Sequence, residues 1–258
     1  MGHGFMTEDM VIEDGKGRRF ELPQPNNYAD LVIYLVHGTW GSPEEHWSDE
    51  FIGFLMDEFN IPRGNIHAPE WTGTLGGDIR GSGGLLLAIN IQSNPQINTD
   101  TNMLIVGYSH GGNVAKENLN FLHDIFGFDL GNTTLLTVAT PIITSHQLNQ
   151  ATRESLGFLF NAFNNYDSVQ LAGTMHITGS RAAEPGFIVD GTLIQKIVGG
   201  RFLHSANRNI PVTRYIPRGT DNVAGLAAHS AMHNNPNVWR YYFLYLLMNS
   251  FNEVGGCE

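Results

Sequence analysis

Hydrophobic and polar positions follow two patterns along this chain of 258 residues. The first is a short apolar run rich in β-branched residues, which is typical of a strand covered on both faces. It occurs at residues 31–36, 103–106 and 135–138, and more weakly at residues 158–163 and 212–216. The second has the spacing of a helix with an apolar face. It occurs after Ser48, which is placed to cap a helix, and over residues 112–125 and 238–251.

Strands and helices that alternate in this order predict an α/β fold with a mostly parallel central sheet flanked by helices. No fixed-period repeat and no Pro/Ser-rich linker divides the chain, so we expect one domain over residues 1–258, with residues 1–29 as an N-terminal extension. In such sheets the reactive groups lie at the carboxyl ends of the strands. The segments that directly follow the strands are therefore where chemistry is expected.

Composition and charge exclude several functional classes. Hydrophobic residues make up 41% of the chain, enough for a large core, which excludes a disordered chain. The formal net charge of −11 repels phosphate backbones and anionic lipid headgroups, so we expect no nucleic-acid partner. The one cysteine, Cys257, excludes an intramolecular disulfide. Oligomeric state stays open at this stage.

The segment up to Lys16 is polar and acidic, without the basic-then-apolar layout of a secretory signal. The longest apolar run, residues 241–248, is far shorter than the roughly 20 residues that span a bilayer. We therefore expect no transmembrane segment, and either a cytoplasmic location or export by a route that needs no signal peptide.

The sequence GYSHG at residues 107–111 directly follows the second strand candidate and precedes a helix candidate. A G-x-S-x-G in that context is typical of a nucleophile elbow, a turn so tight that small residues are needed two positions before and after the serine. Gly107 and Gly111 meet that need. A chance match in a chain of 30 glycines is the alternative, which the strand-turn-helix context disfavours. We predict Ser109 as the nucleophile, at a helix N-terminus where developing negative charge is favoured.

The HGTWG segment that begins at His37 directly follows the first strand candidate. Acyl transfer to a serine needs two backbone N–H donors aimed at the oxyanion. One is expected from His110, the residue after the nucleophile. The other is expected from this segment, where Gly38 lets the backbone approach closely; Thr39 is the first candidate and Trp40 the second. An ordinary strand-ending turn is the alternative.

The acid and base of a triad should follow the serine in the order Ser, Asp/Glu, His. Asp167 lies just after a strand candidate, among turn residues, where its carboxylate can orient an imidazole. A solvated turn aspartate is the alternative. Other candidates for the acid are Asp129, Asp190 and Asp221.

The base is either His229 or His233, both expected on the loop before the last helix. We favour His229, which has small neighbours and a longer lead into that helix. Being four residues apart, the two could also bind a metal, but no intervening Glu and no third ligand accompany them, so we expect no metal site. The remaining histidines considered show no such placement, and we expect most to be ordinary surface or hydrogen-bonded residues: His46, His67, His123, His146, His176 and His204.

Together these motifs resemble the α/β-hydrolase superfamily, in particular its lipase and carboxylesterase branch. The resemblance runs from the first buried strand through HGTWG, GYSHGG, NNYDSV and HSAMHNNPNVW, and leaves out the first thirty or so residues. In bacterial lipases of this kind an apolar residue opens the final helix some way after the catalytic histidine, and His229 with Val238 resembles that spacing better than His233. The elbow has His110 where an aliphatic residue or Gln is commoner. The stretch FNNYDSVQLAG is weakly similar to lipase-like domains of secreted bacterial effectors and toxins.

The resemblance implies acyl transfer through a covalent ester on Ser109, with His229 as base, Asp167 as its partner, and no metal or organic cofactor. It implies a lipase, phospholipase or esterase. An acyltransferase, a thioesterase, an amidase or an inactive binding protein are the alternatives.

Two segments bear on the substrate. Residues 71–92 are rich in glycine and end in an apolar stretch, so they form either a mobile lid or an ordinary loop and flanking helix. Residues 175–217 contain enough apolar residues to pack as a small cap. An apolar lid or cap predicts a lipid or small hydrophobic ester as substrate, and contact with a lipid interface.

Overall fold

The computed structural model describes residues 11–13, 19–21, 28–74, 77–142, 146–164, 167, 169–170, 208–211 and 226–250. Within these residues, six strands form one parallel sheet in the order β4-β3-β5-β6-β7-β8. They are Val32–Val36 (β3), Ile66–His67 (β4), Met103–Tyr108 (β5), Thr133–Val138 (β6), Phe158–Phe163 (β7) and Arg208–Pro211 (β8). Val11–Glu13 (β1) and Arg19–Glu21 (β2) pair antiparallel in the N-terminal extension.

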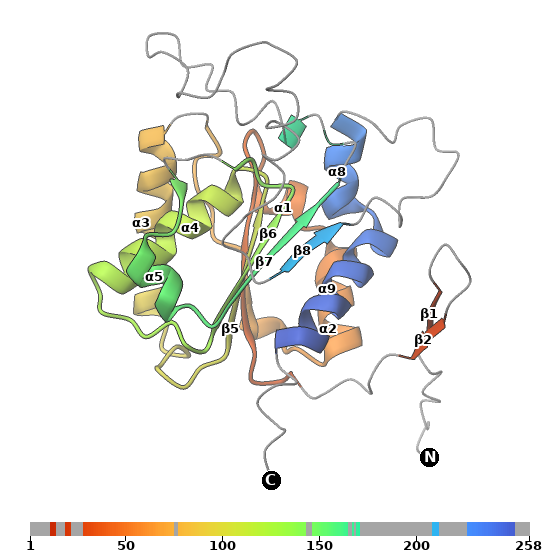
Figure 1. The fold of residues 1–258 in the computed structure, drawn as a ribbon, viewed down its shortest axis with the longest axis horizontal. Helices are drawn as coiled ribbons and strands as arrows, with labels where there is room; N and C mark the ends of the chain where they lie inside the picture. The colour runs from red at the N-terminus through yellow and green to blue at the C-terminus, as the bar shows by residue number, and fades with distance from the viewer. Residues whose placement is uncertain are drawn as a thin grey trace.

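Helices lie on both sides of the sheet, which confirms the predicted fold class (Figure 1). One side carries Gly77–Ser93 (α3), Gly111–Asp124 (α4) and Gln150–Ser155 (α5). The other carries Asp49–Phe59 (α2), Leu226–Asn234 (α8) and Pro236–Ser250 (α9). The short helix Pro43–His46 (α1) precedes α2, and a 3-10 turn spans Arg63–Asn65 (η1). None of the described helices combines the length and apolar character that a membrane span requires.

The two helical layers explain why the strands are apolar throughout. In β3, Ile33 and Leu35 belong to the core that includes Phe51 of α2 and Phe243 of α9. The alternate side chains, Tyr34 among them, face the second core, under α3 and α4. Successive side chains of a strand point to opposite faces, so a strand between two helical layers has no solvent face.

Most element predictions agree with the structure to within two residues, but the placement of the candidate bases on a loop is wrong. His229 and His233 lie on α8, where Ala228 and Met232 are buried on one side of the helix. Its small residues weaken the apolar pattern by which a helix is recognised. The strand candidate at 212–216 lies outside the described residues, as does the cap candidate 175–217 apart from β8 at 208–211.

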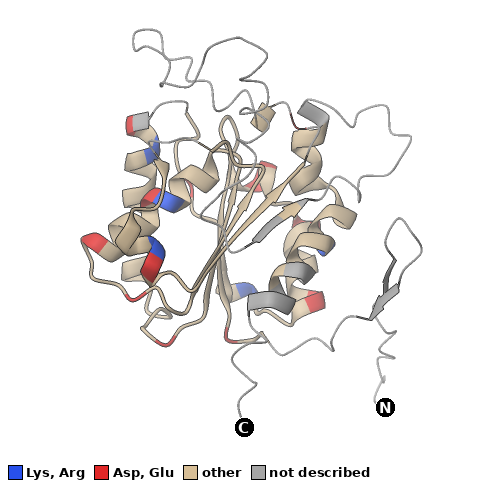
Figure 2. Cartoon of the chain, viewed as in Figure 1, with Lys and Arg blue, Asp and Glu red and all other residues tan. Residues whose placement is uncertain are grey.

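Strands β3 to β7 are free of Lys, Arg, Asp and Glu, and most charged residues of the described part of the chain lie on the helices and connecting segments (Figure 2). The acidic residues are dispersed over several elements. In the described part of the chain, the negative charge is therefore spread over several elements rather than gathered on one.

Candidate active site

Ser109 sits at the turn between β5 and α4, with its backbone in the left-handed region at φ +53°. Its N–H donates to the carbonyl oxygen of Val138 on β6, 2.8 Å away, which helps hold this conformation. A Cβ at Gly107 would overlap the backbone of Gly112. One at Gly111 would overlap the carbonyl oxygens of Val36 and His37, at the end of β3. Glycine is thus required at positions 107 and 111 because the backbone of neighbouring segments approaches closely. The tight turn that these glycines permit places Ser109 between β5 and α4.

The three side chains expected to form a triad lie in hydrogen-bonded sequence. The Ser109 hydroxyl donates to Nε2 of His229 over 3.0 Å, and His229 Nδ1–H donates to Oδ2 of Asp167 over 2.6 Å. Asp167 is fully buried and Ser109 is 6% exposed, so the approach to Oγ is narrow. The chain brings together residues 109, 167 and 229 from three separate elements.

Asp167 is held by its own short segment after β7. Its Oδ1 accepts the N–H of Gln170 at 2.8 Å, and its N–H donates to the carbonyl oxygen of Asn164. The Asn164 amide in turn donates to the carbonyl oxygen of Ala228 on α8, next to His229. These bonds fix the carboxylate relative to the helix that carries the imidazole, so Oδ2 is left facing Nδ1.

His233 does not reach the serine. Its Nδ1–H donates to the carbonyl oxygen of His46 at 3.2 Å, and its ring packs on Tyr108 with 4.4 Å between centroids. Burial, with a smaller contribution from the neighbouring His46, lowers the pKa of His233 to about 4. The ring is a partly buried neutral donor one helical turn beyond His229, and the geometry favours His229 as the partner of Ser109.

The two candidates for the second oxyanion donor differ in what their amides do. The N–H of Trp40 donates to the carbonyl oxygen of Gly73 at 2.8 Å, so it is already engaged. The amide of Thr39 donates to none of the described residues. A Cβ at Gly38 would lie 2.9 Å from the Cβ of Ser109, so this backbone passes against the nucleophile. Thr39 is thus the better placed of the two, alongside His110 at the start of α4.

His37 stabilises the HGTWG segment, residues 37–41, from within the core. Its Nδ1–H donates to the carbonyl oxygen of Gly38 at 2.8 Å, and its ring stacks on Trp71 at 5.5 Å. The Trp71 indole N–H donates back to the carbonyl oxygen of His37 at 2.8 Å. Burial lowers the pKa of His37, so the neutral ring is favoured. Trp71 was not predicted here, because no local pattern indicates a partner 34 residues along the chain.

The histidines expected to be ordinary divide into two kinds. His46 packs against Tyr108 and His37, and burial lowers its pKa. His146 is buried between Arg80 and Glu117, accepting at Nε2 from the first at 3.1 Å and donating to the second at 2.7 Å. His67 is half-buried beside β3, whereas His123 pairs with a neighbouring aspartate at the surface. His176 and His204 lie outside the described residues.

The one rival acid among the described residues, Asp129, does not belong to this site. Asp129 is exposed and accepts the N–H of Gly131, while Asp190 and Asp221 lie outside the described residues. Among the described residues no three His, Cys, Asp or Glu side chains are grouped so as to hold a metal ion. The arrangement at Ser109 is suited to acid–base and nucleophilic chemistry.

No protein-family model and no curated protein matches the sequence. Several solved structures resemble it at low identity. An esterase from Pyrococcus furiosus is 13% identical over 93% of this chain and 90% of its own, with a TM-score of 0.46. A gene product from Listeria innocua is 12% identical over 86% and 94%, with a TM-score of 0.48. A lipase-esterase related protein from Clostridium acetobutylicum is 11% identical over 45% and 44%, with a TM-score of 0.32. These resemblances are too remote to bear on the chemistry, which rests on the side chains.

Proposed function

We propose that the protein is a serine hydrolase that cleaves carboxylic esters, of the lipase or esterase type. The observation that carries the proposal is the hydrogen-bonded sequence from Ser109 Oγ through His229 to Asp167, with distances of 3.0 and 2.6 Å. A serine hydroxyl is a weak nucleophile unless an adjacent base removes its proton. Here the base is in contact with the hydroxyl and is itself oriented by a buried carboxylate.

In the proposed reaction His229 Nε2 takes the proton of Ser109 as Oγ attacks the ester carbonyl. Asp167 stabilises the imidazolium and keeps Nδ1 protonated, so Nε2 faces the serine. The imidazolium then gives the proton to the departing alcohol, which leaves an acyl group on Oγ. Water, activated by the same imidazole, adds to that ester, and the carboxylic acid departs as Ser109 recovers its proton.

The oxyanion formed in each half-reaction would be held by the amides of His110 and Thr39. The loss of one such donor typically costs about 2.7–4 kcal/mol of barrier. Because the donors are backbone groups, the Thr39 side chain is not required for this role. Glycine at position 38 is required, because its backbone lies so close to Ser109 that a Cβ there would displace the segment.

The proposed substrates are esters with a hydrophobic acyl group. Trp40 supports this, since it directly follows the proposed oxyanion donor and is 78% exposed, leaving a large aromatic surface beside the site. An apolar substrate or a lipid interface that covers such a side chain gains by removing it from water. The lid candidate, residues 71–92, contains α3, which packs against α4 through Gly84.

Hydrolysis of p-nitrophenyl esters tests this function. We expect His229→Ala to lower kcat/KM by at least about 10³-fold, as removal of a triad base does. His233→Ala, on the same helix, is the matched control and should lose about tenfold or less. A preference for butanoate to octanoate over acetate would support a hydrophobic acyl site. Equal losses in the two variants would contradict the choice of base, and no preference beyond acetate would contradict the substrate class.

A further inference from the structure

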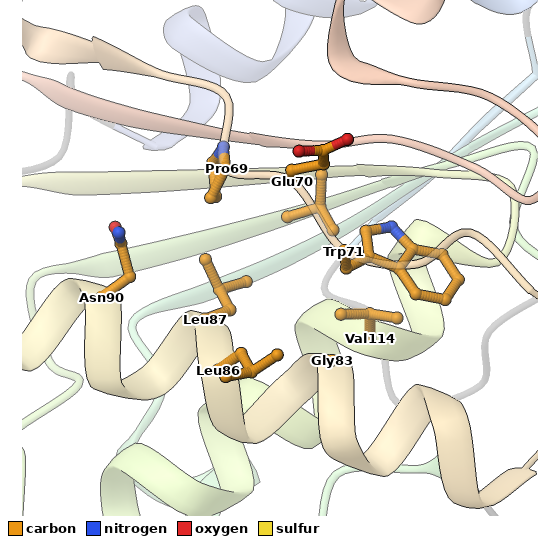
Figure 3. A pocket seen from close by; sticks show the side chains of 9 residues that line it. Pro69, Glu70, Trp71, Gly83, Leu86, Leu87, Asn90 and Val114 are labelled. Carbon is orange, nitrogen blue, oxygen red and sulfur yellow. The ribbon is translucent and has the colours of Figure 1, made fainter.

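A pocket of about 310 Å³ lies between α3 and the segment that follows β4, and Ser109, Asp167 and His229 do not line it. Figure 3 shows Leu86, Leu87 and Asn90 on α3 facing the segment that carries Glu70 and Trp71. This volume is at the lower end of the range for small-molecule sites. The pocket thus has the size of a site for one small organic ligand.

The inner wall of the pocket is apolar and belongs to the core. Val36 of β3, Leu87 of α3 and Val114 of α4 are buried, and the Trp71 side chain closes one end. Such a wall removes apolar ligand surface from water, worth roughly 25 cal/mol per Å². The wall therefore selects a ligand with an apolar body.

The rim differs from the wall in polarity. Glu70 and Asn90 both line the pocket and are exposed, and neither side chain has a hydrogen bond or ion pair with the described residues. Glu70 carries the one formal charge of the lining. Beside them Leu86 is 58% exposed, an apolar surface that a ligand would cover. The rim therefore selects a cationic or hydrogen-donating end and disfavours a carboxylate.

We propose that this pocket binds a small amphiphilic amine, with its apolar body against Trp71, Leu87 and Val114 and its ammonium group at Glu70. A free carboxylic acid, the product of the proposed hydrolysis, would meet like charge at this rim. The pocket is also distinct from the proposed triad, whose three residues do not line it. The proposed ligand site is tested by a binding measurement that requires no turnover. Failure of this site and failure of the proposed function can therefore be told apart.

Calorimetric titration and saturation-transfer NMR with three ligands of one shape test the proposal: 4-phenylbutylamine, 4-phenylbutanol and 4-phenylbutanoate. For the wild-type chain we expect the amine to bind most tightly, the alcohol about three- to fivefold more weakly, and the carboxylate weakest. That factor is the one expected for an ion pair at an exposed rim.

Two pairs of variants locate the site. Glu70→Gln should remove the advantage of the amine over the alcohol, whereas Glu50→Gln, an exposed acidic residue on α2, should leave it intact. Leu86→Ala should weaken the binding of all three ligands about fivefold. Ile89→Ala is its control, since Ile89 is 47% exposed on the same helix but does not line the pocket.

The proposal is overturned if none of the three ligands binds at millimolar concentration. It is equally overturned if Glu50→Gln lowers amine binding as much as Glu70→Gln, because the attraction would then be that of the acidic surface as a whole. Equal binding of amine and carboxylate to the wild-type chain would also contradict it.

Discussion

Tyr108, the residue before the proposed nucleophile, lies among three histidines. Its ring centroid is 5.0 Å from that of His229, 4.4 Å from that of His233 and 5.2 Å from that of His46. Its hydroxyl donates to the carbonyl oxygen of His229 at 3.3 Å. With the bond from His233 to His46, these contacts fix α8 against the last residue of β5 and against α1. The imidazole that touches Oγ is thus held by its neighbours as well as by Asp167.

Removal of the His233 donor should therefore disturb catalysis through His229. We expect His233→Leu to lower kcat about tenfold with little change in KM, and His233→Gln, which keeps an N–H donor, to restore most of it. Steady-state kinetics on one activated ester measures both. A purely packing role would give the opposite order, with leucine better tolerated than glutamine.

The lowered pKa of His233 also predicts a pH dependence of stability. The unfolded chain binds this proton near pH 6.5 and the folded chain only near pH 4, so between these values the unfolded state binds more protons. The contribution of His233 to the free energy of unfolding therefore falls as pH drops from 6.5 to 4. Denaturant titrations should show a shallower acid-side loss in His233→Leu; the same slope in both chains would contradict this.

Single residues can be predicted from the sequence where a local pattern marks their role. The flanking glycines of the G-x-S-x-G pattern identify Ser109. Asp167 and His229 follow it along the chain in the order expected for the acid and base of a triad. His46 and Trp71 carry no such mark, because each acts through contacts with residues distant along the chain. Thr39 and Trp40 were separated only by a backbone hydrogen bond to Gly73, which no side-chain pattern could indicate.

At the scale of elements, α3 is unusual in its glycines. Gly83 packs against Trp71, and Gly84 packs so closely on α4 that a Cβ would lie 2.6 Å from that of Glu117. Arg80 reaches through His146 to Glu117 and joins the same two helices. Residues 71–92, predicted as either a glycine-hinged lid or an ordinary loop and flanking helix, thus contain a helix that needs glycines to approach its neighbour. Because these glycines contribute no side chain to an apolar face, the sequence lacks the periodic apolar pattern by which a helix is recognised.

Two glycines of α3 should respond oppositely to the same substitution. Around Gly81 no atom lies within 4 Å of an added Cβ, so Gly81→Ala should stabilise the fold by about 0.5–1 kcal/mol through helix propensity. Gly84→Ala should destabilise it by roughly 1–3 kcal/mol, since α4 must move. Urea unfolding of the two variants beside wild type measures both, and a shift of the same sign in both would contradict this packing.

At the scale of the whole molecule, the sheet and its two helical layers follow from the sequence because an all-apolar strand can be covered only from both sides. The registers of the strands and the identity of the polar residues in the interior do not follow from the sequence. Lys116 is one such buried polar residue. It is fully buried on α4, its Nζ donates to Asn113 over 3.4 Å, and burial lowers its pKa to about 7. A lysine in an amphipathic pattern is ordinarily assigned to the solvent face.

Lys116 should make the fold less stable at neutral pH. At pH 7 and below it is protonated in the unfolded chain and costs desolvation in the folded chain; as pH rises from 7 to 10.5 the folded chain loses its proton first and the penalty diminishes. We expect Lys116→Met to raise the Tm at pH 7 by roughly 5 °C, with a smaller gain at pH 10. Calorimetric scans at the two pH values measure this. A gain that is larger at pH 10 would contradict it.

The central claim is that Ser109 is an activated nucleophile. Incubation with a fluorophosphonate, followed by peptide mass spectrometry, tests it most directly, because the reagent forms a stable adduct only with a serine whose hydroxyl is activated. We predict one adduct, on Ser109, in the wild-type chain and none in Ser109→Ala, with labelling of His229→Ala slowed at least about 10³-fold. A wild-type chain that remains unlabelled, or an adduct that persists in Ser109→Ala, would contradict the account.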